Sequence, residues 1–205
     1  MDLVCLDLEG VLVPEIWVEF SNFTGIEELK LTTRDIADYD VLMGKRLSIL
    51  KERGLTLSAI QEVIAQLDPL PGAKTFLDGI RMNYQLVILS DTFYEFASPL
   101  MKKLGWPTLM CHKLNISGDG VIDSYQLRQP DPKRQAVKAF KSLNYKVLAA
   151  GDSYNDTTML AEADAGFLFR APDTVASEFP QYPVTSDFGE LRTFFDKASN
   201  RFNIS

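Results

Sequence analysis

Asp7-Leu8-Glu9-Gly10-Val11-Leu12 decides the fold, because this stretch places acidic residues directly after the apolar run at residues 3–6. The run Leu3-Val4-Cys5-Leu6 is too short and too apolar for a surface helix, and it fits a central parallel strand. Such a strand delivers Asp7 to the carboxyl edge of a sheet, where open α/β folds bind their ligands. A carboxylate at that edge can act as a nucleophile.

A second stretch repeats this arrangement later in the chain. Lys146-Val147-Leu148-Ala149-Ala150 is typical of a buried strand, and Gly151-Asp152-Ser153-Tyr154-Asn155-Asp156 turns sharply into a helix. If the two strands are neighbours, Asp7 and Asp152 share one edge of the sheet. Together they can hold Mg²⁺, which prefers oxygen ligands and usually keeps a substrate phosphate among them.

Four motifs stand in the order found in the haloacid dehalogenase superfamily of aspartyl-phosphate phosphotransferases, which the chain resembles. The motifs are Asp7-Leu8-Glu9-Gly10-Val11, with Glu in the second acidic place; Ser90 after Leu86-Val87-Ile88-Leu89; Lys133 in Asp131-Pro132-Lys133-Arg134; and Asp152 with Asp156. They span residues 7–156 of a 205-residue chain. The ordered set is far more specific than any single motif, because an Asp-x-Glu after an apolar run is common by chance.

The order of the predicted elements gives the fold class. Strands that alternate with helices predict an α/β, doubly wound (Rossmann-like) parallel sheet. The strand pattern stops at Pro14 and returns only at Leu86. We therefore expect a small helical cap at residues 15–71, inserted after the first strand, and a core built from residues 1–14 and 72–205.

Periodicity and turn residues predict the individual elements. In the cap we expect helices at 38–53 and 56–67, with Gly54 as a stop and Ser58 as a cap. The expected core elements are helices at 73–82, 93–104 and 187–198, strands at 86–89, 108–110 and 165–169, a hairpin at 113–127, and a helix, strand and helix from Pro132 to Ala163, with Asp131 as the cap.

The needs of phosphoryl transfer give three motif residues catalytic roles. Asp7 and a phosphate dianion repel each other, so attack by Asp7 requires the metal and Lys133 to neutralise charge. Glu9 lies on the same side of the strand as Asp7, where it can protonate the leaving alcohol and then accept a proton from the hydrolytic water. Asp7 is thus the expected nucleophile and Glu9 the general acid and base, while Lys133 also binds phosphate.

Other motif residues are expected to bind the metal and the phosphoryl group. The resemblance implies that Mg²⁺ is held by Asp7, Asp152 and the main-chain carbonyl of Glu9. Ser90 and the backbone N–H of Asp91 would bind phosphate oxygens at the start of a helix, where unpaired donors favour an anion.

Three more polar residues require an interpretation. Asp156 is expected to orient the waters of the metal or Lys133. The amide of Asn155 can reach bound substrate, although a plain turn residue explains it equally well. The lone His112 is predicted to be structural, because the mechanism already has its acid and base.

The inserted segment resembles the phosphoserine phosphatase branch of the superfamily. In that branch a Glu shortly after the first motif binds the substrate ammonium and an Arg on a cap helix binds its carboxylate; Glu15 and Arg46 match those positions. A zwitterionic amino-acid head needs one acidic and one basic contact, and a planar guanidinium suits a carboxylate. The expected reaction is Mg²⁺-dependent hydrolysis of O-phospho-L-serine through an aspartyl phosphate.

Two departures from that branch concern the phosphoryl acceptor. The branch usually has Asp in the place of Glu9 and Gly-Gly in the place of Asp91-Thr92. Glu9, residues 91–96 and residues 131–135 closely resemble the subgroup of bifunctional phosphoserine phosphatases and homoserine phosphotransferases. Water and homoserine therefore both stand as acceptors, and the chain is expected to act in serine or threonine biosynthesis.

The sequence is also compatible with two other functions. One is a phosphatase of the same mechanism for another small metabolite. The other is a phosphorylatable signalling module like a response-regulator receiver, which also uses Asp, Lys and Mg²⁺. The insertion and Glu9 speak against the second, because a long-lived aspartyl phosphate requires neither a lid nor a built-in base.

Composition limits the partners. A formal net charge of -7 argues against nucleic acid, since binding to a phosphate backbone needs a basic face. No apolar stretch of the sequence is long enough to cross a bilayer, so no membrane partner is expected. Cys5 and Cys111 have no paired spacing and the start lacks the pattern of a signal peptide, which favours the cytoplasm. Small molecules are the expected partners, and a homodimer is compatible with the sequence.

Overall fold

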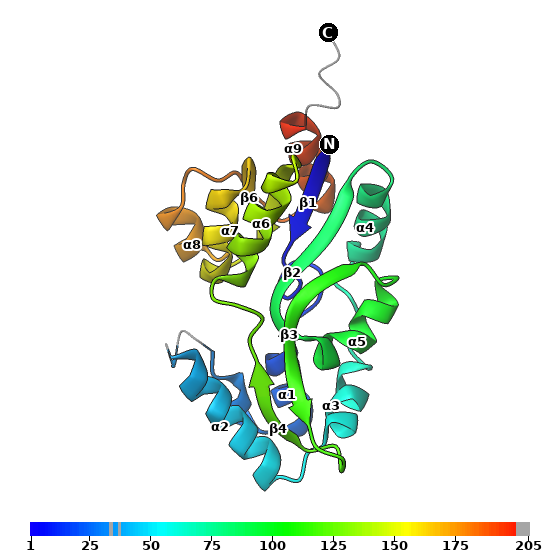
Figure 1. The fold of residues 1–205 in the computed structure, drawn as a ribbon, viewed down its shortest axis with the longest axis vertical. Helices are drawn as coiled ribbons and strands as arrows, with labels where there is room; N and C mark the ends of the chain where they lie inside the picture. The colour runs from blue at the N-terminus through cyan, green and yellow to red at the C-terminus, as the bar shows by residue number, and fades with distance from the viewer. Residues whose placement is uncertain (33–34, 37, 200–205) are drawn as a thin grey trace.

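The fold is an α/β sandwich built on one twisted sheet (Figure 1). The computed structural model describes residues 1–32, 35–36 and 38–199. The sheet has seven strands in the order β4-β3-β2-β1-β5-β6-β7, and only the β3–β4 pair is antiparallel. The strands are β1 (Asp2–Leu6), β2 (Gln85–Phe93), β3 (Thr108–Ile116), β4 (Ile122–Gln126), β5 (Lys146–Gly151), β6 (Ala165–Phe169) and β7 (Val184–Thr185).

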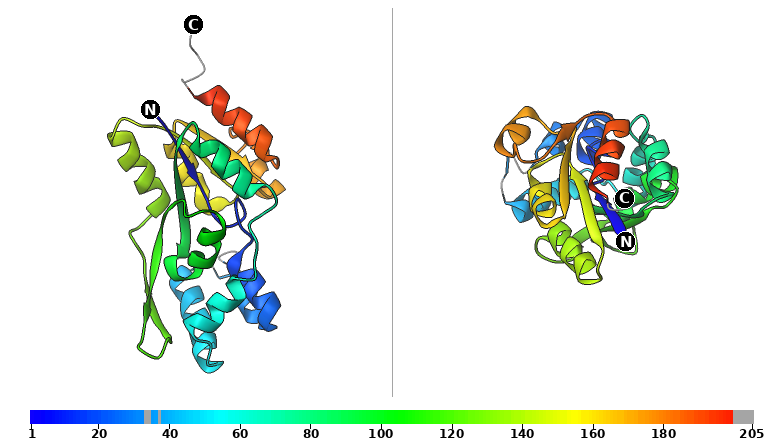
Figure 2. Two further views of the ribbon diagram at one scale, coloured as in Figure 1. Left: turned by 90° about the vertical axis from the view of Figure 1, so that its right-hand side faces the viewer. Right: turned by 90° about the horizontal axis from the view of Figure 1, so that it is seen from above.

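Helices cover both faces of this sheet, as the view from above shows (Figure 2). The α-helices are α1 (Ile16–Thr24), α2 (Tyr39–Glu52), α3 (Leu57–Ile64), α4 (Ala73–Arg81), α5 (Tyr94–Lys103), α6 (Pro132–Ser142), α7 (Thr157–Glu162), α8 (Asp173–Glu178) and α9 (Phe188–Ala198). Short 3₁₀ turns occur at Glu27–Lys30 and Tyr154–Asp156. Helices α4 and α9 pack on one face of the sheet, and α6, α7 and α8 pack on the other.

Strand β1 lies in the centre of the sheet because both of its faces are apolar. Val4 and Leu6 belong to the core on the α4 and α9 side, whereas Leu3 and Cys5 belong to the core on the α6 and α7 side. A strand buried on both faces reads as a continuous apolar run instead of an alternating one. The predicted doubly wound parallel sheet is therefore confirmed.

Helices α1, α2 and α3 lie beyond the carboxyl edge of the sheet, over the ends of β1 and β2 (Figure 1). Helix α1 was not among the predicted elements, although Ile16 and Phe20 stand four residues apart and both are buried. Thr56 caps α3 by accepting the N–H of Ala59 at 3.5 Å, so the prediction of Ser58 as the cap was wrong.

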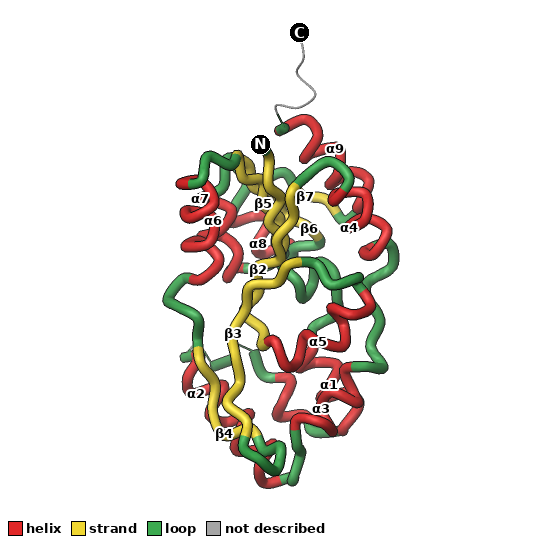
Figure 3. The backbone as a smooth tube through the Cα atoms, turned by 45° about the vertical axis from the view of Figure 1, so that its right-hand side comes forward, coloured by secondary structure: helices red, strands yellow, loops and turns green. Residues whose placement is uncertain are grey.

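Strand β3 runs from the sheet into the cap region without interruption (Figure 3). The sequence predicted a short strand at 108–110 and a separate hairpin, but the structure has one strand that pairs with β2 at its start and with β4 at its end. The hairpin turn bonds to the inserted segment, since Leu57 N donates to Gly120 O at 2.9 Å. Helices α1, α2 and α3 and the β3–β4 hairpin therefore lie together beyond the carboxyl edge of the sheet, and we refer to them as the cap region.

Some shorter elements also differ from the predictions. Asp131 occupies the N-cap position of α6, but its side chain makes no capping hydrogen bond and accepts one from Thr158 Oγ1 at 2.8 Å instead. Helix α8 and strand β7 were not predicted. Within the described residues, none of the helices combines the length and apolarity needed to cross a membrane.

Candidate active site

Asp7 and Asp152 lie side by side at the carboxyl edge of the sheet. Strands β1 and β5 are neighbours, with Leu6 opposite Ala150, and each strand is followed by one of the two aspartates. Backbone N–H of Asp7 donates to Ala150 O at 3.0 Å, which fixes the loop after β1 against β5. Strands β1 and β5 are therefore adjacent, which is the condition for Asp7 and Asp152 to share one edge of the sheet.

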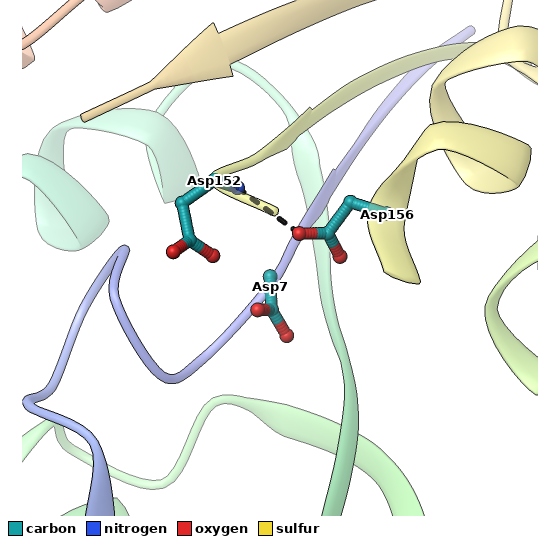
Figure 4. Close-up of side chains that lie close together, drawn as sticks. All are labelled: Asp7, Asp152 and Asp156. Carbon is teal, nitrogen blue, oxygen red and sulfur yellow. Dashed lines mark hydrogen bonds between the residues drawn. The ribbon is translucent and has the colours of Figure 1, made fainter. Parts of the chain in front are cut away.

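Three carboxylates converge at this edge (Figure 4). Asp7, Asp152 and Asp156 each offer an oxygen, and these atoms lie within 4.8 Å of one another. Burial and then Asp156 raise the pKa of Asp7, and the same two causes raise the pKa of Asp152 to about 7. Burial and mutual repulsion thus disfavour the ionised form of these carboxyl groups, and a divalent cation bound among them would offset that repulsion.

A glycine makes room for the Asp152 carboxylate. Gly10 has a φ of 76°, in the left-handed region, and a Cβ atom at this position would overlap the carboxylate of Asp152. Only glycine takes this conformation without strain and leaves the space free. The loop after β1 thereby lets Asp152 approach Asp7, and the donor set of oxygen atoms fits a hard cation such as Mg²⁺.

Asp156 is fully buried, and both of its carboxylate oxygens accept hydrogen bonds from other residues of the protein. Oδ2 accepts the backbone N–H groups of Asp152 and Ser153 at 3.0 and 3.1 Å, and Oδ1 accepts from Lys133 Nζ at 2.7 Å. It therefore fixes the turn that carries Asp152 and also holds the lysine. Of the two roles expected for Asp156, orienting the waters of the metal or Lys133, this geometry favours the second.

Lys133 lies in the first turn of α6 and its ammonium faces three carboxylates. Nζ is 2.7 Å from Asp156 Oδ1, 2.9 Å from Asp7 Oδ1 and 3.4 Å from Asp91 Oδ2. Burial by itself lowers the pKa of a lysine, but Asp156, Asp7 and Asp91 outweigh it and raise the pKa of Lys133 well above its usual range. The buried lysine thus remains charged at neutral pH.

The environment of Ser90 differs from the prediction. Ser90 and Asp91 were expected at the start of a helix, but β2 continues to Phe93 and α5 begins only at Tyr94. The strand continues because β2 and β3 pair again at Phe93 after a shift of register. Ser90 Oγ accepts the N–H of Thr92 at 3.3 Å, and both residues belong to β2, so Ser90 and Asp91 do not lie at a helix N-terminus.

Asp91 directs its carboxylate into the site, a contact that sequence analysis missed. Asn155 Nδ2 donates to Asp91 Oδ2 at 2.8 Å, and His112 Nε2 lies 3.7 Å from Asp91 Oδ1. Burial would raise the pKa of Asp91, but Lys133, with the nearby His112 and the hydrogen bond from Asn155, lowers it well below its usual range. The signal in the sequence was the acidic residue where the resembled branch has glycine.

Glu9 connects the loop after β1 to the cap. Its Oε2 accepts the backbone N–H of Ile16, the first residue of α1, at 3.1 Å. Burial and then the Glu15 carboxylate raise the pKa of Glu9 to about 8. The carboxyl group is therefore protonated at neutral pH and can donate a proton.

Arg46 projects from α2 into the same pocket and is buried. Its guanidinium lies 4.4 Å from the centroid of the Trp17 ring, and Nη2 donates to Leu31 O at 2.7 Å. Burial lowers the pKa of Arg46 to about 10. Among the buried side-chain polar atoms of the described residues, Nε of Arg46 is the one without a hydrogen-bond partner. A buried donor without a partner favours binding of an acceptor from outside.

The structure brings most predicted site residues into one pocket between the sheet edge and the cap helices. Predicted residues that line it are Asp7, Glu9, Glu15, Arg46, Ser90, Asp91, Lys133 and Asn155. Trp17 and Tyr39 complete the wall on the cap side. Asp152 and Asp156 join them through the carboxylate cluster.

A doubly wound sheet that carries a carboxylate cluster and a buried lysine at its carboxyl edge is typical of α/β enzymes that act on phosphate esters with a metal. The model of one such family, the haloacid dehalogenase-like hydrolases, matches residues 1–164. The chain belongs to this family.

Its relatives include two bacterial proteins that are similar along almost the whole chain. A phosphoserine phosphatase of Pseudomonas syringae pv. tomato is 63% identical over 201 residues, which cover 98% of this chain and 85% of that protein. Phosphoserine phosphatase ThrH of Pseudomonas aeruginosa is also 63% identical over 201 residues, and 98% of each chain is covered.

Solved structures share the fold at low sequence identity. A phosphoserine phosphatase in its apo form superposes with a TM-score of 0.76 at 20% identity, over 94% of this chain and 98% of that one. A phospho-aspartyl intermediate analogue of phosphoserine phosphatase superposes with a TM-score of 0.74 at 18% identity, over 94% and 98% of the two chains.

Proposed function

We propose that this enzyme is a Mg²⁺-dependent phosphomonoesterase that hydrolyses O-phospho-L-serine through a phosphorylated Asp7. The observation that carries the proposal is a single pocket lined by Asp7, Lys133 and Arg46, whose buried Nε has no hydrogen-bond partner within the described residues. Both relatives at 63% identity bear the name phosphoserine phosphatase, which supports the same substrate here.

The residues that would hold Mg²⁺ are Asp7, Asp152 and the main-chain carbonyl of Glu9. When bound, the ion supplies positive charge that offsets the repulsion between a carboxylate and a phosphate dianion. The fit rests on the converging oxygens of Asp7 and Asp152 and on the space that Gly10 leaves for the Asp152 carboxylate.

The reaction follows from the positions of Asp7 and Glu9. An oxygen of Asp7 attacks phosphorus, the bond from phosphorus to the serine oxygen breaks, and the protonated Glu9 gives its proton to that oxygen. In the second half, Glu9 takes a proton from water as the water attacks the aspartyl phosphate. Asp7 and inorganic phosphate are released, and Glu9 has regained its proton.

The amino-acid head of the substrate would bind between Glu15 and Arg46. Arg46 offers its free Nε–H to the carboxylate, and its stacking on Trp17 holds the guanidinium plane in position. Glu15 is exposed at the start of α1 and offers a carboxylate to the ammonium. One acidic and one basic contact match a zwitterion.

A test of this function measures release of inorganic phosphate from phosphoserine with Mg²⁺ and with EDTA. Turnover should require Mg²⁺, and Asp7→Asn should reduce kcat by at least about a thousandfold, because an amide cannot attack phosphorus. Phosphoserine should be preferred over phosphothreonine, phosphoethanolamine and glycerol phosphate in the same panel. A better substrate in that panel, or turnover by Asp7→Asn within about tenfold of wild type, would contradict the proposal.

Homoserine is a second candidate acceptor, because Glu9 has one methylene more than the Asp of the resembled branch. The longer side chain of Glu9 accepts the backbone N–H of Ile16, so its carboxyl group is positioned differently from that of a shorter Asp. The space available to the attacking hydroxyl group differs accordingly. Adding homoserine to a phosphoserine reaction should then divert phosphate into phosphohomoserine, and Glu9→Asp should lower the ratio of transfer to hydrolysis. An unchanged ratio would assign the choice of acceptor to the cap pocket instead.

A further inference from the structure

Asp91 places an acidic side chain among the groups that would bind the phosphoryl group. It follows Ser90 directly, and its Oδ2 lies 3.4 Å from Lys133 Nζ and accepts from Asn155 Nδ2 at 2.8 Å. Its other oxygen, Oδ1, faces His112 Nε2 at 3.7 Å. The carboxylate therefore has partners on both oxygens, and it lies beside the one buried lysine of the pocket's described lining.

The orientation of His112 supports this placement of the Asp91 carboxylate. His112 is buried, and its Nδ1 accepts the backbone N–H of Arg128 at 3.1 Å. Because Nδ1 is an acceptor, the neutral ring carries its proton on Nε2, which is the atom that faces Asp91. Tyr39 adds a contact from the cap, where its hydroxyl donates to the carbonyl of Asp91 at 3.5 Å.

The three carboxylates around Lys133 are not held equally. An ammonium group has three N–H donors, so a phosphoryl oxygen that binds Lys133 must replace a carboxylate. Asp156 and Asp7 are the closer partners, at 2.7 and 2.9 Å, and their side chains are 0% and 6% exposed. Asp91 lies at 3.4 Å and its side chain is 30% exposed. The contact to Asp91 is the one that is most easily exchanged.

We propose that the Asp91 carboxylate competes with the phosphoryl group for Lys133 and thereby weakens the binding of inorganic phosphate. This inference rests on the proposed function, which places the phosphoryl group of substrate and product beside Lys133. Asp156 holds the ammonium throughout, while Asp91 occupies the remaining donor when the pocket is empty and yields it to a phosphate oxygen. Asn155 and His112 keep the released carboxylate nearby, so that it can return and favour departure of the product.

The experiment measures the dissociation constant of inorganic phosphate by calorimetry at saturating Mg²⁺. Asp91→Asn keeps the shape of the side chain and removes its charge, and Asp91→Ala removes the whole carboxylate. Both should bind phosphate about fivefold more tightly than wild type, the size expected for relief of one partly exposed ionic contact. Asp123→Asn on β4 is the matched control, because this exposed residue loses the same charge outside the pocket and should leave the constant unchanged.

Gain of affinity separates this role from a purely structural one, because damage to the fold weakens binding. Phosphate binding that is unchanged or weaker in both variants would overturn the proposal. Tightening in Asp91→Asn alone would also overturn it, since the new amide and not the lost charge would then be responsible. A raised KM for phosphoserine with unchanged phosphate affinity would instead assign Asp91 to the substrate ammonium.

The affinity for inorganic phosphate tests the role of Asp91, whereas turnover of phosphoserine tests the proposed function. Inorganic phosphate is the probe, so loss of phosphoserine as substrate would refute the proposed function and leave the expected gain in phosphate affinity in place. Conversely, a phosphoserine phosphatase with no gain in the Asp91 variants would refute only this inference.

Discussion

Asp7 and Lys133 are both buried, and each offsets part of the charge of the other. Their atoms are 2.9 Å apart and neither side chain is more than 6% exposed. Loss of one partner from a buried ion pair leaves the other charge uncompensated, which commonly costs about 3 to 5 kcal/mol of stability. Asp156 and Asp91 reduce this dependence for the lysine, because they remain when Asp7 is phosphorylated.

The pKa of Glu9 predicts an alkaline limit on turnover. Burial and Glu15 raise this pKa to about 8, so Glu9 carries the proton for the leaving group below that pH and loses it above. The kcat/KM for phosphoserine should therefore fall as the pH rises through about 8. p-Nitrophenyl phosphate has a leaving group that needs no proton, and its profile should lack this limb. Equal limbs for the two substrates would remove Glu9 as the acid.

Substitution of Arg46 tests recognition of the substrate carboxylate. Arg46→Ala should cost about 2 to 4 kcal/mol in kcat/KM for phosphoserine and much less for p-nitrophenyl phosphate, which has no carboxylate. Lys45→Ala is the matched control, because this neighbour on α2 is exposed and carries the same charge. Arg46→Lys should recover little, because an ammonium lacks the planar fork. Equal losses on both substrates would mean that Arg46 supports the fold of the cap.

At the scale of elements, the loop after β1 leaves space for Asp152, which follows β5, to approach Asp7, which follows β1. Gly10 takes a φ of 76° and borders the Asp152 carboxylate with no space for a side chain. The loop is held by Gly10 N, which donates to Val13 O at 2.8 Å, and by the bond from Glu9 to α1. Gly10 thus allows the Asp152 carboxylate to lie against the loop that follows Asp7.

Gly10→Ala should move Asp152 away from Asp7 and weaken Mg²⁺ binding by about tenfold or more, the usual effect of disturbing groups that orient metal ligands. Gly118→Ala, in the hairpin turn, serves as the control because a Cβ there meets no atom within 4 Å. Calorimetric titration with Mg²⁺ measures both. An unchanged affinity in Gly10→Ala would show that Asp152 does not need its present position to bind the ion.

The central strands could be predicted from the local sequence, whereas the course of β3 could not. The central strands were predictable because a parallel strand buried on two faces is continuously apolar, and the motif aspartates follow directly from those strands. The continuity of β3 was not predictable, because His112 pairs with β2 and Lys113 pairs with β4, and that change of pairing partner is set by tertiary structure. The contact between Asp91 and Lys133 is likewise made by elements that are distant in sequence.

At the scale of the molecule, the raised pKa values make stability depend on pH and on metal. Asp152 has a pKa of about 7 in the fold against an ordinary value of 3.8, so the folded state binds more protons than the unfolded state between these values. The free energy of unfolding of the metal-free enzyme should therefore fall as the pH rises from about 4 to about 7. Asp7 acts in the same direction.

Mg²⁺ should reverse this trend, because it binds the ionised carboxylates and stabilises the folded state more as they lose their protons. Thermal unfolding at pH 5 and pH 7.5, with and without Mg²⁺, measures the effect. The increase in Tm caused by Mg²⁺ should be larger at the higher pH, and Asp152→Asn should remove most of the difference. An increase that does not depend on pH would place the ion elsewhere.

Because β3 is one uninterrupted strand, the side of the pocket next to the β3–β4 hairpin is tied to the sheet. Bending this strand would break ladder hydrogen bonds to β2 on one stretch and to β4 on the next, so the hairpin moves with the sheet as one body. The insertion is attached differently, through single-chain connections near Pro14 and Gly72 that belong to neither helix nor strand. The inserted helices α1, α2 and α3 are joined to this hairpin where Leu57 N donates to Gly120 O, and their apolar side chains share its core, so the mouth of the pocket has one side held by a continuous backbone ladder and one side held by helix packing.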